Sequence, residues 1–70
     1  MNAIGIGLGR RIKEIRKKRG ITQEELAEFI DTSYKYIQRI EGKNPPDVRL
    51  TTIVRLAKAL KVKPAELLKF

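Results

Sequence analysis

The apolar residues of this 70-residue chain recur with the period of an α-helix and not with the alternation of a β-strand. Leu8, Ile12 and Ile15, for example, stand at i, i+4 and i+7, which places them on one side of a helix. The pattern predicts a compact all-α domain over residues 8–70. Its five helices are expected at about residues 9–19, 23–30, 33–41, 50–60 and 64–69. Residues 1–7 have no clear cap and are predicted to be a flexible N-terminal lead, or alternatively a strap across the helices.

Residues 20–42 are predicted to form two short helices joined by a tight turn. Thr22 and Glu25 have the spacing of a capping box, in which each side chain accepts from the other residue's backbone N–H. Asp31 belongs to the few residue types besides glycine that tolerate a left-handed turn. Ser33 follows as a natural N-cap of the next helix. Helix, short turn and helix together form a motif that DNA-binding proteins use.

The second of these helices has an inward and an outward face on a wheel of about 100° per residue. Ile37 and Ile40 point inward, with Glu41 at their edge. The outward side chains are those of Lys35, Gln38 and Arg39, flanked by Tyr34 and Tyr36. Arginine and lysine donate to guanine O6 and N7, and glutamine pairs with adenine N6 and N7. The outward face therefore suits base edges in the DNA major groove, and an ordinary solvated surface is the alternative.

Residues 50–60 are predicted to form the main cover of the core. Their apolar positions, which give a wide face on a helix, are Leu50, Ile53, Val54, Ala57 and Leu60. Val62 is expected to complete the core after this helix ends. Two prolines precede the helix, so residues 43–49 are expected to form a loop.

The charge of the chain is strongly positive. Sixteen lysine and arginine residues stand against 8 acidic residues, which gives a net charge of +8 and a pI near 10.2. Such a balance favours a polyanionic partner, with a nucleic acid as the leading candidate and an acidic membrane or protein as the alternative. Residues 10–19 hold seven basic side chains and one acidic one. Among them, Arg11, Lys13 and Lys17 are expected to be solvated surface residues.

The chain lacks the residues that several kinds of chemistry require. It contains no cysteine and no histidine, so neither a disulfide framework nor an ordinary zinc site is expected. The commonest general base and the most reactive nucleophile are therefore missing. The glycines near the N-terminus and Gly42–Lys43 do not have the spacing of nucleotide-binding motifs. We expect no enzymatic activity, no cofactor, no metal and no small-molecule ligand.

Membrane insertion is not expected either. No apolar run approaches the ~20 residues of a membrane span. The first nine residues are apolar, but basic residues follow them and do not precede them, which is not the order of a signal peptide. The expectation is a cytoplasmic protein of bacterial, phage or archaeal origin.

The helix–turn–helix segment also has a characteristic residue pattern. Leu26–Ala27, a turn, Ser33, Tyr36–Ile37 and Ile40–Glu41 together resemble the lambda-repressor-like (Cro-type or XRE-type) helix-turn-helix family. Residues 10–16 and 56–60 are also similar, so the resemblance covers roughly residues 8–68. It implies a five-helix domain that binds double-stranded DNA and regulates transcription, as a repressor, a restriction–modification controller or an antitoxin. The alternative is a small helical interaction module whose basic surface binds an acidic protein.

The resemblance further implies which side chains contact DNA. Base contacts are expected from Tyr34, Lys35, Gln38 and Arg39. Phosphate contacts are expected from Gln23, Ser33, Tyr36, Lys43, Asn44 and Arg49. Gln23 is alternatively an ordinary first-turn residue of its helix. For Tyr36, packing against the neighbouring helix is an equal expectation.

Two charged residues border the predicted core. Arg16 lies one turn beyond Ile12 in the first helix, and Glu41 lies four residues after Ile37. A lone, partly buried charge is costly, so two such charges of opposite sign favour pairing. The resemblance implies an Arg16–Glu41 ion pair at these positions, and two independent surface charges are the alternative.

The C-terminal segment carries more apolar surface than so small a domain easily buries. The residues concerned are Leu67, Leu68 and Phe70. One interpretation is that all three complete the core. The other is that they belong, with the last two helices, to the contact surface of a homodimer. A symmetric dimer would place two recognition helices one DNA turn apart, ~34 Å, on a palindromic operator.

Overall fold

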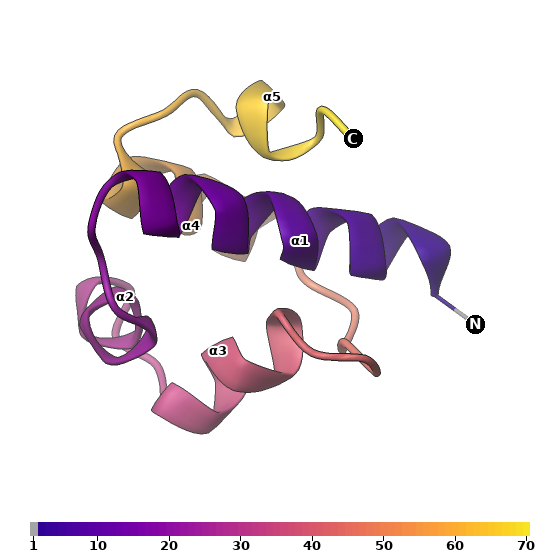
Figure 1. The fold of residues 1–70 in the computed structure, drawn as a ribbon, viewed down its shortest axis with the longest axis horizontal. Helices are drawn as coiled ribbons and strands as arrows, with labels where there is room; N and C mark the ends of the chain where they lie inside the picture. Colours follow the sequence, from indigo (N-terminus) through magenta and orange to yellow (C-terminus); the bar gives the residue numbers. More distant parts are fainter. Residues whose placement is uncertain (1) are drawn as a thin grey trace.

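The computed structural model describes residues 2–70, and these residues form five α-helices and no strand (Figure 1). The helices are α1 (Ala3–Lys18), α2 (Gln23–Phe29), α3 (Tyr34–Ile40), α4 (Leu50–Leu60) and α5 (Pro64–Leu67). The prediction of an all-α, five-helix domain is therefore confirmed. None of the helices in this part of the chain is both long and apolar enough to cross a membrane.

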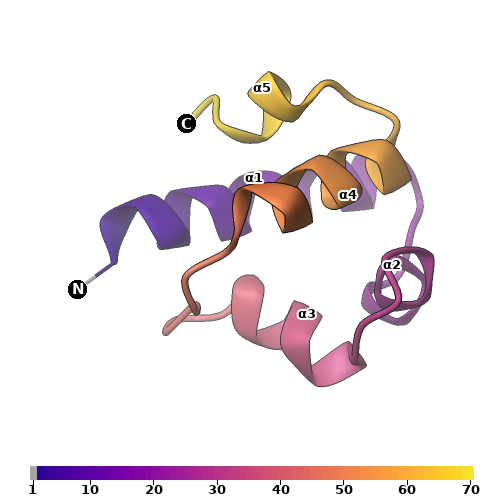
Figure 2. The same ribbon diagram turned by 180° about the vertical axis from the view of Figure 1, so that it is seen from behind.

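Helix α1 runs through the middle of the molecule and separates α5 from the pair α2 and α3 (Figure 1). Seen from behind, α4 lies in front of α1 and below α5 (Figure 2). Helices α2 and α3 pack against each other, as do α4 and α5. The buried apolar side chains form one core: Leu8, Ile12, Ile15, Leu26, Ala27, Ile30, Ile37, Ile40, Ile53, Leu56, Ala57, Leu60 and Leu67. All five helices thus contribute to a single core.

Helix α1 begins at Ala3, well before the predicted start near residue 9. The Asn2 side chain caps it, because Asn2 Oδ1 accepts a hydrogen bond of 2.8 Å from the Gly5 backbone N–H. The prediction of a separate lead over residues 1–7 is therefore wrong for residues 3–7, which are helical, while Met1 lies outside the described residues. Glycine lowers helix propensity, but the contacts that α1 makes with the rest of the fold override this preference.

Helix α1 approaches the end of α3 closely at Gly9. A Cβ atom built on Gly9 would lie 2.1 Å from the carbonyl oxygen of Ile40, the last residue of α3. Gly9 is also buried. Only a residue without a side chain allows the two helices to cross at this separation.

The start of α2 and the turn to α3 have the predicted local structure. Thr22 Oγ1 accepts from the Glu25 N–H at 3.0 Å, and Glu25 Oε1 accepts from the Thr22 N–H at 2.9 Å. Asp31 has a φ of 55°, which is left-handed backbone. Ser33 Oγ accepts from the Tyr36 N–H at 3.1 Å and caps α3. A capping box, a left-handed turn and a serine cap therefore define this helix–turn–helix.

The buried face of α4 is rotated relative to the prediction. Leu56 is fully buried, whereas Leu50 and Val54, which were expected in the core, are 77% and 47% exposed. Helix α4 packs between α2 and α5, and these two neighbours contact a face that Leu56 shares with Ile53 and Leu60. The prediction for Leu50 and Val54 is therefore wrong, and both are surface residues.

The C-terminal apolar residues divide between core and surface. Leu67 is fully buried in the core, so it is not a dimer-contact residue and that prediction is wrong. Helix α5 ends at Leu67, two residues earlier than predicted. Leu68 and Phe70, which follow it, are 49% and 61% exposed. Leu67 at the end of α5 therefore belongs to the core, and Leu68 after it lies on the surface.

Candidate nucleic-acid interface

The outer face of α3 carries polar side chains that can donate hydrogen bonds. Lys35, Gln38 and Arg39 are all exposed. Ile37 and Ile40 of the same helix are buried and fix α3 to the core. The predicted division of this helix into two faces is present in the structure, and the donors of its outer face point away from the core.

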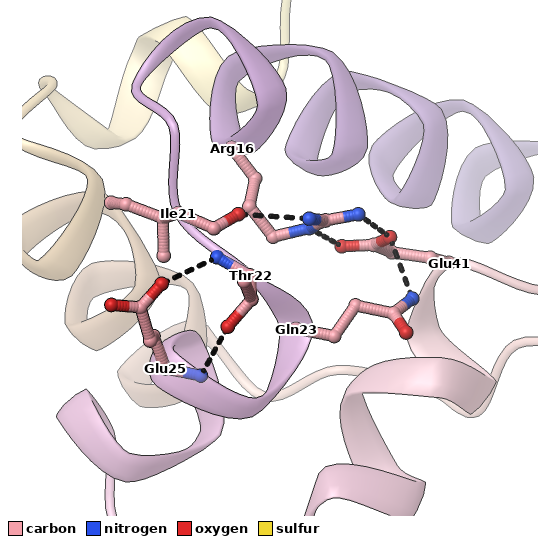
Figure 3. A network of polar contacts seen from close by, with 6 residues as sticks. All are labelled: Arg16, Ile21, Thr22, Gln23, Glu25 and Glu41. Carbon is pink, nitrogen blue, oxygen red and sulfur yellow. Dashed lines mark hydrogen bonds and ion pairs between the residues drawn. The ribbon is translucent and has the colours of Figure 1, made fainter.

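A network of hydrogen bonds holds α3 to α1 and α2 (Figure 3). Arg16 Nε donates to Glu41 Oε2 at 2.8 Å, and Arg16 Nη2 donates to Glu41 Oε1 at 2.9 Å. The third nitrogen, Nη1, donates to the carbonyl oxygen of Ile21 at 2.8 Å. The side chains of Arg16 and Glu41 are only 9% and 2% exposed. The ion pair implied by the sequence is present, and it is bidentate and almost completely buried.

Gln23 belongs to the same network. Its Nε2 donates to Glu41 Oε1 at 3.0 Å (Figure 3). This bond ties the start of α2 to the end of α3, a contact that sequence reasoning missed because it depends on how the helices cross. An amide nitrogen carries two N–H donors, so a second one remains for a DNA phosphate. The predicted phosphate contact by Gln23 stays a prediction.

Ser33 and Tyr36 lie at the start of α3. Ser33 is exposed, and its oxygen accepts from the Tyr36 N–H, which leaves the hydroxyl proton of Ser33 free to be donated. Tyr36 is half-buried and packs against the core cluster. The packing interpretation of Tyr36 is therefore correct, and a phosphate contact through its hydroxyl remains a prediction.

The loop after α3 carries further basic and polar residues. Lys43, Asn44 and Arg49 are exposed in this loop. Val48 packs against the core and anchors the loop from within. The ion pairs found among residues 2–70 use the cations of Arg11, Arg16 and Lys69. The cations of Lys35, Arg39 and Lys43 are therefore not neutralised by a carboxylate of the described chain.

Comparisons with known proteins agree with this arrangement. A helix-turn-helix family profile matches residues 12–67 of the chain. Among solved structures, the chain is similar to the restriction-modification controller protein C.AhdI from Aeromonas hydrophila, with 33% identity, a TM-score of 0.84 and coverage of 90% of this chain and 94% of that one. No curated protein matches the sequence.

Two other similar structures are those of gene regulators. The clp gene regulator ClgR from C. glutamicum is 26% identical, with a TM-score of 0.87 over 93% of this chain and 82% of that one. The master regulator for biofilm formation SinR, solved in complex with DNA, is 29% identical, with a TM-score of 0.82 over 89% of this chain and 98% of that one. The family profile covers most of the chain, and the five-helix fold agrees with it. The chain therefore belongs to the helix-turn-helix family of DNA-binding transcriptional regulators.

Proposed function

We propose that this protein binds a palindromic operator in double-stranded DNA as a homodimer, and that it acts as a repressor, a restriction–modification controller or an antitoxin. The observation that carries the proposal is the outer face of α3, where Lys35, Gln38 and Arg39 are exposed on a helix anchored by buried isoleucines. The similarity to the controller protein C.AhdI supports it, because the alignment covers nearly all of both chains.

In this proposal α3 is the recognition helix. The N-terminal residues of a recognition helix reach base edges in the major groove, which assigns the deepest contacts to Tyr34 and Lys35. Gln38 and Arg39 follow one turn later and extend the same face. Their donors match the acceptors that purines present in the major groove. Base recognition by these four side chains is what makes the binding sequence-specific.

The proposed phosphate contacts lie around α3 and fix its position on the duplex. The residues are Gln23, Ser33, Tyr36, Lys43, Asn44 and Arg49. Such contacts supply affinity and orientation but carry no sequence information. The exposure of the loop residues among them and the free hydroxyl proton of Ser33 support this assignment.

The proposed dimer surface lies on α4 and α5. Leu68 and Phe70 are exposed there, and Leu50 and Val54 add exposed apolar area on α4. These exposed apolar side chains in and next to the last two helices are the basis for placing the dimer surface there. A second copy of the chain is the proposed occupant, since a two-fold dimer matches the symmetry of a palindromic operator.

Selection from random-sequence DNA tests the recognition helix. At about 150 mM salt, the wild type is expected to enrich an inverted repeat with half-sites about one helical turn apart. The Lys35→Ala/Arg39→Ala variant should lose that preference and bind the enriched site at least about 1,000-fold more weakly, because the homodimer loses four base contacts and each contributes about 1–3 kcal/mol. The matched control is Lys18→Ala/Lys63→Ala, which removes the same charge from exposed residues outside α3. An unchanged preference in the Lys35→Ala/Arg39→Ala variant would remove α3 from the role of recognition helix.

Disruption of the proposed dimer surface should weaken binding to the full inverted repeat but not binding to a single half-site. Leu68→Glu is expected to weaken binding to the full inverted repeat about 100-fold, because bivalent attachment is lost, and to leave binding to a single half-site unchanged. Titration of both DNAs, with sedimentation of the complexes, measures this difference. The control is Phe29→Glu, which adds the same charge to an exposed apolar residue of α2. Equal losses in both variants would contradict a dimer surface at Leu68.

A further inference from the structure

Helix α1 presents a stripe of three cations on the side that faces α3. Arg10, Lys13 and Lys17 stand at i, i+3 and i+7, which places them on one side of the helix. All three are exposed, and no carboxylate pairs with them among residues 2–70. Their side of α1 adjoins the buried positions Gly9 and Arg16, through which α1 contacts α3. The stripe therefore lies beside the recognition helix.

Two of these cations line a depression at the C-terminal end of α3. Arg10, Lys13 and Lys43 line this depression, which has a volume of about 350 Å³ and is also lined by Gly42. Glu41 also lines it, but its carboxylate is bonded to Arg16 and is 2% exposed. Three cations and no free carboxylate make this a site for an anion.

The third cation lines a depression at the opposite end of α3. Lys17 lies there with Gln23 and Tyr34, in a depression of about 400 Å³. Glu24 also borders it, so this end is less positive than the other. Figure 1 shows the reason for the arrangement: α1 lies alongside α3, with its C-terminal end toward α2 and its N-terminal end toward the loop after α3. The stripe thus reaches both ends of the recognition helix.

Arg11 and Lys18 of α1 lie on a different side, and Arg11 is half-buried rather than the solvated surface residue that was expected. Arg11 Nε donates to the carbonyl oxygen of Glu66 at 2.8 Å, and Arg11 also pairs with the carboxylates of Glu14 and Glu66. Lys18 lines a depression with Arg11 and Glu66, next to α5. Arg11 is therefore paired with carboxylates, whereas no carboxylate pairs with the stripe among the described residues, although Glu14 and Glu24 line depressions with Arg10 and Lys17. The cations of the stripe thus remain available to an anion.

We propose that Arg10, Lys13 and Lys17 bind DNA phosphates on both sides of the base contacts that α3 makes. The inference rests on the proposed function and adds α1 to the DNA-binding surface. The two depressions also contain Lys43 and Gln23, which the proposed function assigns to DNA phosphates. Arg10, Lys13 and Lys17 therefore adjoin proposed phosphate contacts at both ends of α3. Lys13 and Lys17 are exposed, as the sequence predicts, and the proposal gives them this role in addition.

The salt dependence of binding tests the proposal, because each phosphate contact contributes a slope of about −0.9 to log K against log[salt]. Lys13→Gln/Lys17→Gln removes one cation from each depression and should reduce the magnitude of the slope by about 1.8 per protomer, or about 3.6 for the homodimer. Its preference among sequences should stay the same, because phosphate contacts carry no sequence information. The control, Lys18→Gln/Lys63→Gln, has the same net charge and should keep the wild-type slope.

The outcomes separate this proposal from the proposed function. Suppose that the wild type selects a site, and that Lys13→Gln/Lys17→Gln and its control Lys18→Gln/Lys63→Gln have equal salt slopes. The stripe then does not bind phosphates, although the protein still recognises DNA. If the wild type selects no site, the proposed function fails, and the inference fails with it. Thermal unfolding of both variants followed by circular dichroism checks that the fold is intact, and exposed positions predict no change in melting temperature.

Discussion

The Glu41→Ala variant is expected to unfold at a much lower urea concentration than the wild type, with a loss of about 3–5 kcal/mol in the free energy of unfolding. The substitution leaves the guanidinium of Arg16 buried, with the Ile21 carbonyl oxygen as its only remaining partner in the network. Domains of this size have a stability of about 5 kcal/mol. The loss would therefore remove most of the stability, and circular dichroism at 25 °C should show a large unfolded fraction.

The double variant Arg16→Met/Glu41→Leu isolates the cause of that loss. It removes both charges together, so no buried charge remains unpaired, and it should be more stable than Glu41→Ala. Glu14→Ala is the matched control at the surface, since it removes the partner of Arg11 from a pair in which Glu14 is 54% exposed. A cost below about 1 kcal/mol is expected there. Equal midpoints for Glu41→Ala and Glu14→Ala would show that the buried pair has no structural role.

The Gly9→Ala variant should be destabilised by roughly 2 kcal/mol, although alanine is the better helix former. Its Cβ atom would lie 2.1 Å from the Ile40 carbonyl oxygen and 3.1 Å from the carbonyl carbon. Both are backbone atoms, so relief requires α1 to move away from α3. The movement would also stretch the hydrogen bonds between Arg16 and Glu41. Urea unfolding measures the loss, and weaker operator binding should accompany it.

Gly7→Ala is the control in the same helix. A Cβ atom on Gly7 would meet the ring of Phe70 at 2.2 Å. That ring is 61% exposed and belongs to a side chain that can rotate away. The variant should therefore keep the wild-type stability or gain up to about 1 kcal/mol from helix propensity. Equal destabilisation by Gly7→Ala and Gly9→Ala would contradict a specific close approach at Gly9.

Local rules predicted the parts of the fold that depend on near neighbours in the chain. The capping box of Thr22 and Glu25 needs only a spacing of three residues, and the inward face of α3 needs only the helical period. The pairing of Arg16 with Glu41 was also accessible, because two charges beside a predicted core need each other. Most of the candidate interface follows from these features and from the family resemblance.

The missed features depend on how helices cross. Leu56 and Val54 are both apolar, and only the positions of α2 and α5 decide which of them is buried. The same holds for Leu67, the last residue of α5, and Leu68, which follows it: both are apolar, and only the packing of α5 decides which is buried. The sequence did not predict the early start of α1, because glycine lowers helix propensity. The contact of Gly9 with Ile40 joins two helices and cannot be inferred from residue spacing. The bond from Gln23 to Glu41 was missed for the same reason.

The buried residues of α3 attach it to the core and its exposed residues do not, and this separation has a consequence for substitutions in α3. Ile37 and Ile40 are its buried side chains, and the bonds of Glu41, its C-cap, complete the attachment to α1 and α2. The exposed positions Lys35, Gln38 and Arg39 have no comparable structural duty. Substitutions there are expected to be nearly neutral for stability. Under the proposed function, substitutions at these positions would change the DNA sequence that the protein prefers while the scaffold stays constant.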